Sequence, residues 1–279
     1  KALFAHIGHT IGNGLRAFLT GLTGSHFVGV PASVAPETRR YYQQLTRFSS
    51  AFAFLADVSM LVMGGDLKRK EKLSARMGDI LSLMYLSSAV LKRYEAEGRQ
   101  QADAPLMHWA IWDSMFKAQN AFEGVVSNFP SRFVSTLLRR TIFPLGRPYV
   151  VPSDRLGGCV ADLLIAPSAT RDRLTAGMYL PRDENDAVGV IELALEAVIA
   201  AEPIHHKIRT AQKAGKVEGR SAQELESQSL AHGVITSAEH ALLLRARELT
   251  GEVIKVDDFP FDLGLRRSEP KPVAQRAAA

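Results

Sequence analysis

Histidines and a single cysteine are the side chains whose types and spacing could bind a metal or attack a carbonyl group. His6 and His9 are three residues apart, as two ligands on one helix face would be, and His205 and His206 are neighbours. A metal site also needs a third ligand and an acidic second shell at a fitting spacing, and the sequence offers neither. Cys159 follows two glycines and lacks a His-Asn set. The sequence therefore predicts no metal site and no cysteine nucleophile.

A dense cationic cluster is the next candidate for function. Its members are Lys68, Arg69, Lys70 and Lys72, with Arg76 one turn further along. Positive charge at the start of a helix opposes the helix dipole, which favours contact with a partner protein or an anionic membrane surface. The alternative interpretation is a solvated helix face that keeps the chain in solution, and both interpretations stay open at this point.

One carboxylate, Asp57, interrupts the most apolar stretch of the chain, residues 48–63. An unpaired buried carboxylate is costly, so it needs a partner. A helical hairpin that turns at Gly64 and Gly65 would place Asp57 opposite Lys72, with Arg76 one turn beyond. We therefore predict an Asp57–Arg76 ion pair, with a solvent-facing Asp57 as the alternative.

Composition limits the class of protein. The chain has 279 residues, 46% apolar and 23% charged, which is typical of a folded globular protein. Its net charge is +5, of which residues 265–279 supply +3 (four Arg or Lys against one Glu). The remaining +2 gives no basic groove, so we expect no nucleic-acid partner. No window of about 18 uncharged apolar residues predicts a membrane span, and one cysteine suits a reducing compartment.

The apolar pattern is helical almost throughout, so the predicted fold class is all-α. Residues 4, 7, 11, 15, 18 and 22 form one stripe of a first helix, and Gly64-Gly65-Asp66 predicts a hairpin between the second and third helices. We predict an antiparallel helical bundle over residues 1–143. A connector with short helices follows over 144–183, which holds five of the 13 prolines. A smaller helical unit follows over 184–264, where Pro203 is expected to begin a new helix. Residues 265–279 are predicted to be a disordered basic tail.

Two sequence signatures point toward known families. His6-Ile7-Gly8-His9 matches a tetrapeptide of class I aminoacyl-tRNA synthetases, and residues 72–76 faintly resemble their second signature. Those enzymes need a strand before the tetrapeptide and a βαβ pattern after it, and this sequence predicts neither. The sequence therefore does not support the synthetase hypothesis, and a circular-dichroism spectrum without strand content would exclude it.

The stronger signature is an ordered series of motifs that resembles the C-terminal region of bacterial FadE-type acyl-CoA dehydrogenases, from Phe4 to about Phe261. The motifs include Arg40-Tyr41-Tyr42-Gln43, Asp57-Val58-Ser59-Met60, Ser74-Ala75-Arg76, Ala89-Val90-Leu91-Lys92-Arg93-Tyr94, Asn128-Phe129-Pro130, Ile142-Phe143-Pro144 and Val256-Asp257-Asp258-Phe259.

The resemblance implies an FAD-dependent enzyme that converts acyl-CoA to trans-2-enoyl-CoA in the first step of fatty-acid β-oxidation. It also implies electron transfer to an electron-transfer flavoprotein and a cytoplasmic location, at the inner membrane if the cationic cluster binds lipid. The family's FAD site and its glutamate base belong to a catalytic core, which we expect upstream of Lys1.

The base of this family lies in a Glu-Gly-containing run, and this chain has three Glu-Gly pairs. Glu97 and Glu218 lie in strongly polar stretches, whereas Glu123 stands between Phe122 and Val125. A base needs a partly apolar pocket to raise its pKa, so Glu123 is the best of the three. Its surroundings do not match the family's run, and we assign no catalytic residue and no FAD site to this chain.

Overall fold

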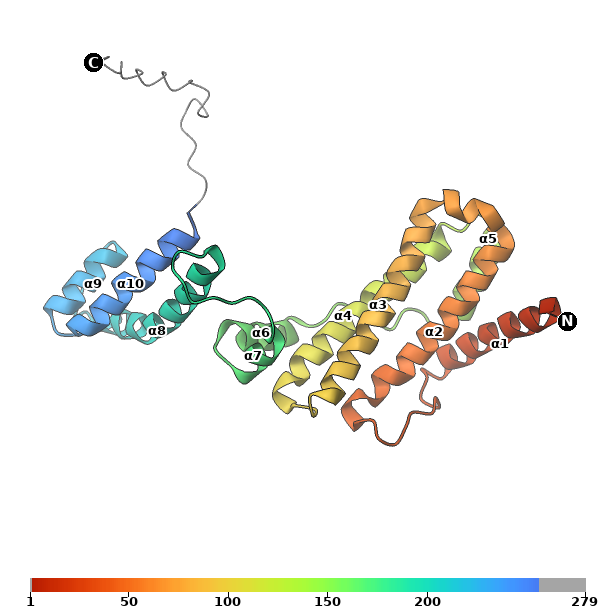
Figure 1. The fold of residues 1–279 in the computed structure, drawn as a ribbon, viewed down its shortest axis with the longest axis horizontal. Coiled ribbons are helices and arrows are strands. Elements are labelled where there is room, and N and C mark those ends of the chain that lie inside the picture. Colours follow the sequence, from red (N-terminus) through yellow and green to blue (C-terminus); the bar gives the residue numbers. More distant parts are fainter. Residues whose placement is uncertain (1, 256–279) are drawn as a thin grey trace, which may run out of the picture. The chain divides into compact units, whose positions relative to one another are not determined.

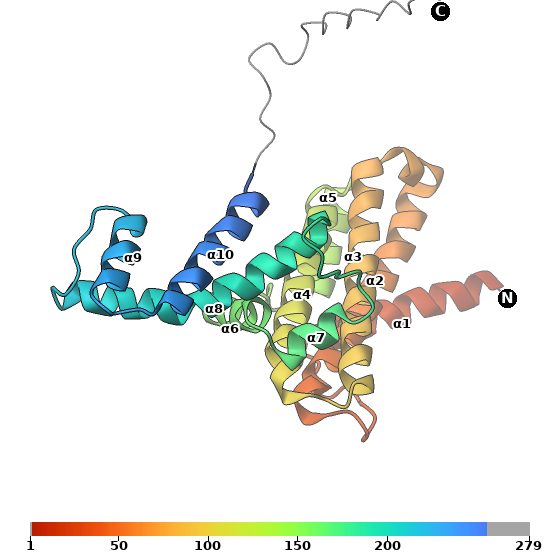
Figure 2. The same ribbon diagram turned by 60° about the vertical axis from the view of Figure 1, so that its left-hand side comes forward.

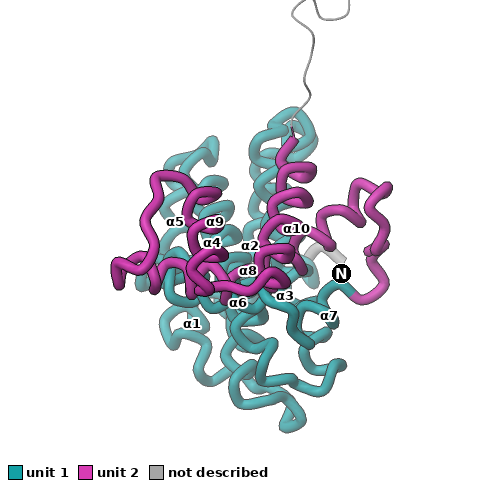
Figure 3. Tube along the Cα trace, turned by 90° about the vertical axis from the view of Figure 1, so that its left-hand side faces the viewer, with its two compact units in different colours: residues 1–175 teal, residues 176–279 magenta. Residues whose placement is uncertain are grey.

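The computed structural model describes residues 2–255, and the regular elements in this range are all helices (Figure 1). The predicted all-α class is confirmed. The chain divides into two compact units, residues 1–175 and 176–279 (Figure 3). The predicted basic tail, residues 265–279, lies outside the described residues.

The first unit holds the antiparallel bundle. Its elements are α1 (Ala2–Leu22), α2 (Pro36–Met63), the 3-10 turn η1 (Gly64–Arg69), α3 (Glu71–Ala96), the 3-10 turn η2 (Gln101–Asp103), α4 (Ala104–Ser127), α5 (Arg132–Ile142), α6 (Asp154–Ile165) and α7 (Ala169–Thr175). Helices α2, α3 and α4 run side by side in alternating directions (Figures 1 and 2).

Local sequence explains where these helices begin and end. Pro36 occupies the first turn of α2, where a missing N–H costs nothing. Gly64 follows α2 with φ of 50°, a left-handed conformation that glycine adopts without strain. The chain therefore reverses at the predicted hairpin, and η1 leads directly into α3.

Aromatic side chains fill the centre of the bundle. Phe122 of α4 is fully buried and meets Phe48 of α2 edge-on, with ring centroids 5.6 Å apart. Phe143, just after α5, also meets Phe122 edge-on, with ring centroids 6.2 Å apart. Tyr149 packs edge-on against Phe48 at 5.8 Å. This cluster draws the segment after α5 back across α2 and α4.

The boundaries of the bundle extend further than the sequence indicates. Helices α6 and α7 lie in the region predicted as a connector, 144–183, and they group with the bundle because the compact units divide between Thr175 and Ala176. Hydrogen bonds from Thr170 and Arg173 of α7 to Asp103 join this region to the start of α4.

The second unit contains α8 (Ala187–Lys213), α9 (Ala222–Ala231) and α10 (Ser237–Val253). Pro203 lies inside α8 rather than at the start of a new helix, so that expectation was wrong. Pro203 is exposed, whereas Ala201 and Ile204 beside it are buried in the core of this unit. Packing on both sides of the proline thus holds α8 continuous despite the lost hydrogen bond.

In the part of the chain that the structure describes, one helix, α2 with its continuation to Arg69, is long and apolar enough to cross a membrane by length and composition. Its residues Phe48, Ala51 and Leu55 belong to the core of the bundle. The apolar composition of α2 is therefore used for packing within the first unit.

Candidate functional site

The predicted Asp57–Arg76 ion pair does not form, so that prediction was wrong. The Asp57 carboxylate accepts a hydrogen bond from Thr10 Oγ1 at 2.8 Å, and His6 Nε2 lies 3.8 Å from its other oxygen. Arg76 instead lies over Gly124 of α4, where a Cβ atom would approach the Arg76 side chain to 2.8 Å. Helix α1 covers the face of α2 that carries Asp57, and α3 directs Arg76 toward α4.

The cationic cluster surrounds η1 and the start of α3. Lys68, Arg69, Lys70 and Lys72 are all exposed. Arg69 and Asp66 approach within 3.9 Å with both side chains largely in solvent, an arrangement that contributes little to stability. The preceding turn of α2 exposes three apolar side chains. These are Met60, Leu61 and Val62.

The Glu-Gly pairs are engaged or exposed. Glu97 forms an ion pair with Arg93 at 2.9 Å. Glu123 forms one with Arg139 at 2.7 Å and accepts a hydrogen bond from Ser127. Glu218 is exposed. Glu123 is therefore held by Arg139 of α5 and by Ser127 of its own helix.

Metal and thiol chemistry find no further support. Within residues 2–255, no group of three or more His, Cys, Asp or Glu side chains could hold a metal ion. Cys159 is an exposed free cysteine on α6. His6 and His9 are exposed on the N-terminal half of α1.

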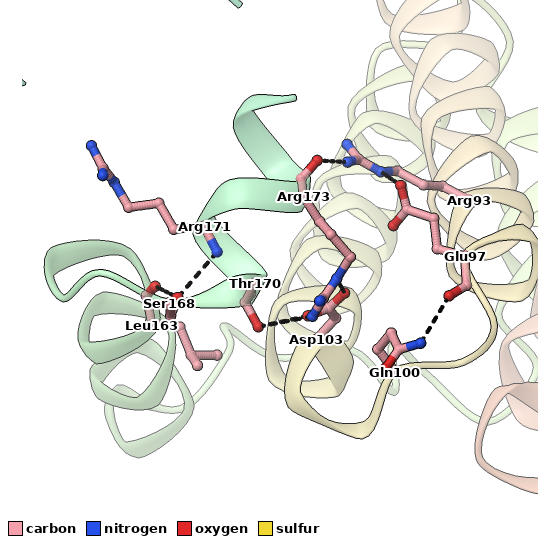
Figure 4. A network of polar contacts seen from close by, with 9 residues as sticks. All are labelled: Arg93, Glu97, Gln100, Asp103, Leu163, Ser168, Thr170, Arg171 and Arg173. Atoms are coloured by element: carbon pink, nitrogen blue, oxygen red, sulfur yellow. Dashed lines mark hydrogen bonds and ion pairs between the residues drawn. The ribbon is translucent and has the colours of Figure 1, made fainter. Parts of the chain in front are cut away.

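A polar network joins α7 to the ends of α3 and α4 (Figure 4). Asp103 accepts hydrogen bonds from Arg173 Nε at 2.8 Å and from Thr170 Oγ1 at 2.6 Å. Arg93 of α3 donates to the Arg173 carbonyl at 2.6 Å. The hydrogen bond from Arg173 lowers the pKa of Asp103, although burial opposes this effect. Arg93, Asp103, Thr170 and Arg173 of this network line a cavity of about 150 Å³ between α3, α4 and α7.

A second polar contact lies between α2 and α4. Tyr41 Oη and His108 Nδ1 are 2.8 Å apart. Burial raises the pKa of Tyr41 to about 12 and lowers the pKa of His108, which favours a neutral phenol and a neutral imidazole. The Tyr41 hydroxyl can then donate to an unprotonated His108 nitrogen, so this pair positions α2 against α4 without carrying charge.

The most unusual surface belongs to α1. Its apolar stripe exists as predicted, but the structure turns that stripe toward solvent. Seven large apolar side chains on this helix are exposed, and they are Phe4, Ile7, Ile11, Leu15, Phe18, Leu19 and Leu22.

The opposite face of α1 packs on the bundle with small side chains. A Cβ atom on Gly14 would lie 2.9 Å from the Phe54 ring, and one on Gly21 would lie 2.7 Å from Pro144. Ala17 between them is buried. These residues let the backbone of α1 approach the bundle closely. The N-terminal end of α1 extends away from the other bundle helices in both ribbon views (Figures 1 and 2).

Sets of exposed apolar residues at helical spacing are unusual on an isolated soluble domain and mark interaction surfaces. The α1 stripe is therefore the candidate interface of the first unit. Its residues were visible in the sequence, but the direction they face was not.

Comparison with known protein families gives one result for the chain as a whole. Residues 1–259 match the family model described as acyl-CoA dehydrogenase, C-terminal, bacterial type. No solved structure matches the chain.

Proposed function

Because the chain belongs to the bacterial-type acyl-CoA dehydrogenase C-terminal family, we propose that it is the helical C-terminal domain of an enzyme that oxidises acyl-CoA to trans-2-enoyl-CoA. This reaction is the first step of fatty-acid β-oxidation. In this proposal the catalytic core precedes Lys1 and holds FAD and the base. Electrons pass to an electron-transfer flavoprotein, and the enzyme works in the cytoplasm.

The cavities of the first unit hold about 150, 230, 330, 470 and 500 Å³, and the larger ones reach the range of small-molecule sites, about 300–1,000 Å³. The two largest are lined by residues such as Arg76 and Asp79, or Arg69 and Lys72, and by no aromatic side chain of the described residues that could stack on a flavin ring. In this proposal we therefore assign the flavin to the core and derive no step of the reaction from this chain.

The family match carries the proposed reaction, and the outward apolar stripe of α1 carries the proposed docking of this domain on the core. A domain that functions without a partner would be more stable with Phe4, Ile11 and Leu15 turned inward, since buried apolar area contributes about 25 cal/mol per Å² to the folding free energy. The chain instead packs Gly14 and Ala17 inward. This arrangement suits a helix that is covered on both faces in the whole enzyme. We therefore propose that the catalytic core covers the stripe.

Hydrogen–deuterium exchange tests this docking in the full-length enzyme. Amides of residues 4–22 should exchange at least ten-fold more slowly in the full-length enzyme than in the isolated chain. The double substitution Ile11→Ser and Leu15→Ser should abolish that protection and leave the helical circular dichroism of the isolated chain unchanged.

Tyr85→Ser is the matched control, because Tyr85 is an apolar residue of α3 with 74% exposure that lies outside the stripe. It should leave the α1 exchange rates as they are. Equal exchange of α1 in the isolated chain and the full-length enzyme would contradict the docking. A full-length enzyme that reduces no electron acceptor with any acyl-CoA would contradict the proposed reaction.

A second candidate function is docking on an anionic membrane, and the cationic cluster favours it. Its four exposed cations stand beside the exposed Met60, Leu61 and Val62. Basic residues near an anionic surface contribute about 1 kcal/mol each, and adjacent apolar side chains can enter the headgroup region. In this candidate the enzyme works at the inner membrane.

Co-sedimentation with phosphatidylserine vesicles tests the membrane candidate. Binding of the isolated chain should weaken steeply between low and physiological salt, where the Debye length falls to about 8 Å. Replacing the four cations with glutamine should remove it. The control replaces Arg132 and Arg140, which are exposed on α5, and should bind as the wild type does. Vesicle binding that survives the four-residue substitution would contradict a membrane role for this cluster.

A further inference from the structure

A polar stripe runs along α2 on the side covered by the segment after α5. Its members are Arg40, Gln44 and Arg47, at positions i, i+4 and i+7 of one helix face. Arg40 and Gln44 line two adjoining cavities of about 230 and 330 Å³, which also share Pro148, and Arg47 lines the smaller one alone. The smaller one, called here the inner cavity, is also lined by Gly21, Gly24, Leu145 and Gly146. The larger one is called the outer cavity.

Arg47 is a buried cation without a counter-ion. Its side chain is 4% exposed and donates one hydrogen bond, from Nη2 to the Ile142 carbonyl at 3.1 Å. Burial lowers the pKa of Arg47, but a guanidinium stays protonated in proteins. Within residues 2–255, no carboxylate forms an ion pair with Arg47 or Arg40. A buried charge of this kind calls for an anion.

The side-chain oxygen of Gln44, which lines the same inner cavity, accepts no hydrogen bond from the described residues. Gln44 is 8% exposed, and its Nε2 donates to the Gly24 carbonyl at 2.9 Å. Its Oε1 is buried and has no hydrogen-bond partner. Arg40 also donates to the Gly24 carbonyl, at 2.7 Å, which fixes the guanidinium at the cavity wall. A ligand that satisfied this site would have to accept from the arginines and donate to Gln44.

Acidic side chains are kept out of the inner cavity. Glu37 lines only the outer cavity. Its carboxylate accepts hydrogen bonds from Tyr94 at 3.2 Å and from Gln101 at 3.3 Å, and its pKa is lowered mainly by a backbone hydrogen bond. The inner cavity is therefore a cationic pocket with one unused acceptor.

We propose that the inner cavity binds a phosphate group, either free or as a monoester. Phosphate oxygens would accept hydrogen bonds from Arg40 and Arg47, as guanidinium groups favour. The second pKa of a phosphate is about 6, so near pH 6 about half of it is the monoanion, whose hydroxyl can donate to Gln44 Oε1. A carboxylate or a sulfate carries almost no proton at that pH and leaves Gln44 unsatisfied.

The phosphate has two possible sources, which titration calorimetry of the isolated chain separates. Inorganic phosphate tests the pocket itself and does not depend on the proposed function. Coenzyme A carries a 3′-phosphate monoester, and dephospho-coenzyme A lacks it; this arm rests on the proposed acyl-CoA dehydrogenase. Binding of coenzyme A at least ten-fold tighter than dephospho-coenzyme A assigns the ester as the source. Binding of inorganic phosphate with no such difference assigns the free anion.

Substitutions in the pocket test the assignment of each group. Gln44→Glu places a carboxylate beside Arg47, so phosphate affinity should fall at least ten-fold while the unfolding temperature holds or rises. Arg40→Gln should also weaken binding about ten-fold. Arg39→Gln is the matched control, since Arg39 is exposed on the same helix and lines neither cavity, and it should bind as the wild type does.

Three results would overturn the proposal. They are the absence of binding by both inorganic phosphate and coenzyme A at 10 mM, unchanged affinity in Gln44→Glu, and equal affinity for sulfate and phosphate. Equal affinity for sulfate and phosphate would show that no phosphate hydroxyl donates to Gln44, and the pocket would then not select phosphate.

Discussion

Gln119 offers the sharpest test of how the bundle holds its cavity-forming segment. This side chain of α4 is 2% exposed and binds both backbone groups of Tyr149. Its Nε2 donates to the Tyr149 carbonyl at 2.8 Å, and its Oε1 accepts from the Tyr149 N–H at 3.0 Å. Trp112 adds a hydrogen bond to the Val150 carbonyl at 2.8 Å. The Gln119 side-chain amide thus makes the two backbone hydrogen bonds to Tyr149 that a neighbouring β-strand would make in a sheet.

The substitution Gln119→Leu removes both bonds and keeps similar bulk. It leaves the buried N–H and the buried carbonyl of Tyr149 without hydrogen-bond partners, which costs about 1–3 kcal/mol of stability for each group. Burial of the additional apolar surface of leucine returns about 1–2 kcal/mol of that loss. We therefore expect the free energy of unfolding of the first unit to fall by about 3 kcal/mol.

Tryptophan fluorescence in urea measures this loss selectively. The two tryptophans of the chain, Trp109 and Trp112, both lie in α4, so their signal reports on the first unit. With an m value of about 2 kcal/mol per M, the urea midpoint should fall by roughly 1–2 M. Gln100→Leu is the control, because Gln100 is exposed, and it should shift the midpoint by less than about 0.3 M.

A second variant separates hydrogen bonding from packing. Gln119→Glu keeps an acceptor for the Tyr149 N–H but turns a carboxylate toward the Tyr149 carbonyl. It should be as unstable as Gln119→Leu at pH 8 and recover as the pH falls toward 5, where a buried carboxyl with a raised pKa regains a proton to donate. A midpoint of Gln119→Leu within 0.3 M of wild type would refute the reasoning, since water would then satisfy Tyr149.

Three further outcomes follow from the contacts of other residues. Asp57→Ala should cost about 1 kcal/mol in urea unfolding, the value of one partly buried hydrogen bond to Thr10; a loss of 3 kcal/mol or more would indicate a buried ion pair instead. Gly189→Ala should destabilise the second unit by about 2 kcal/mol in thermal unfolding followed by circular dichroism, because the new Cβ would lie 2.2 Å from the Asp183 carbonyl oxygen; an unchanged midpoint would contradict this clash. The pKa of Asp103 is lowered in the folded state, so its contribution is present above the unfolded pKa of about 3.9 and is lost as pH falls through the folded value; Asp103→Asn should flatten the urea midpoint between pH 5 and 3, and an unchanged pH profile would show that other carboxylates dominate.

Local signals in the sequence were enough for most helix boundaries. Gly64 ends α2 where the sequence predicts the hairpin, and Thr236 with Glu239 forms a capping box at the start of α10. These features depend on neighbours a few residues apart, so a sequence contains all the information that fixes them. Their agreement with the structure explains why the all-α class and the antiparallel bundle were predictable.

Contacts between distant segments were not predictable in the same way. Asp57 had two helices that could cover it, and periodicity does not choose between Thr10 of α1 and Arg76 of α3. From the sequence alone, Arg40, Gln44 and Arg47 resemble ordinary solvent-facing polar positions of a helix. Only the return of residues 145–149 across α2 encloses it, and Gln119 holds that segment from 30 residues away. The available signal was the spacing of Arg40, Gln44 and Arg47 along one face of α2.

The orientation of α1 and the burial of Arg47 lead to the same conclusion from opposite directions. A stable isolated domain turns its large apolar side chains inward and gives each buried cation a counter-ion. In the first unit, α1 exposes its apolar stripe and packs Gly14 and Ala17 against the bundle. Arg47 is buried, and its hydrogen-bond partner is the Ile142 carbonyl. In our two proposals a protein surface covers the stripe of α1 and an anion neutralises Arg47. The two sites meet on α1, because Gly21 of this helix lines the inner cavity together with Arg47. Helix α1 would therefore contact both the core and the anion.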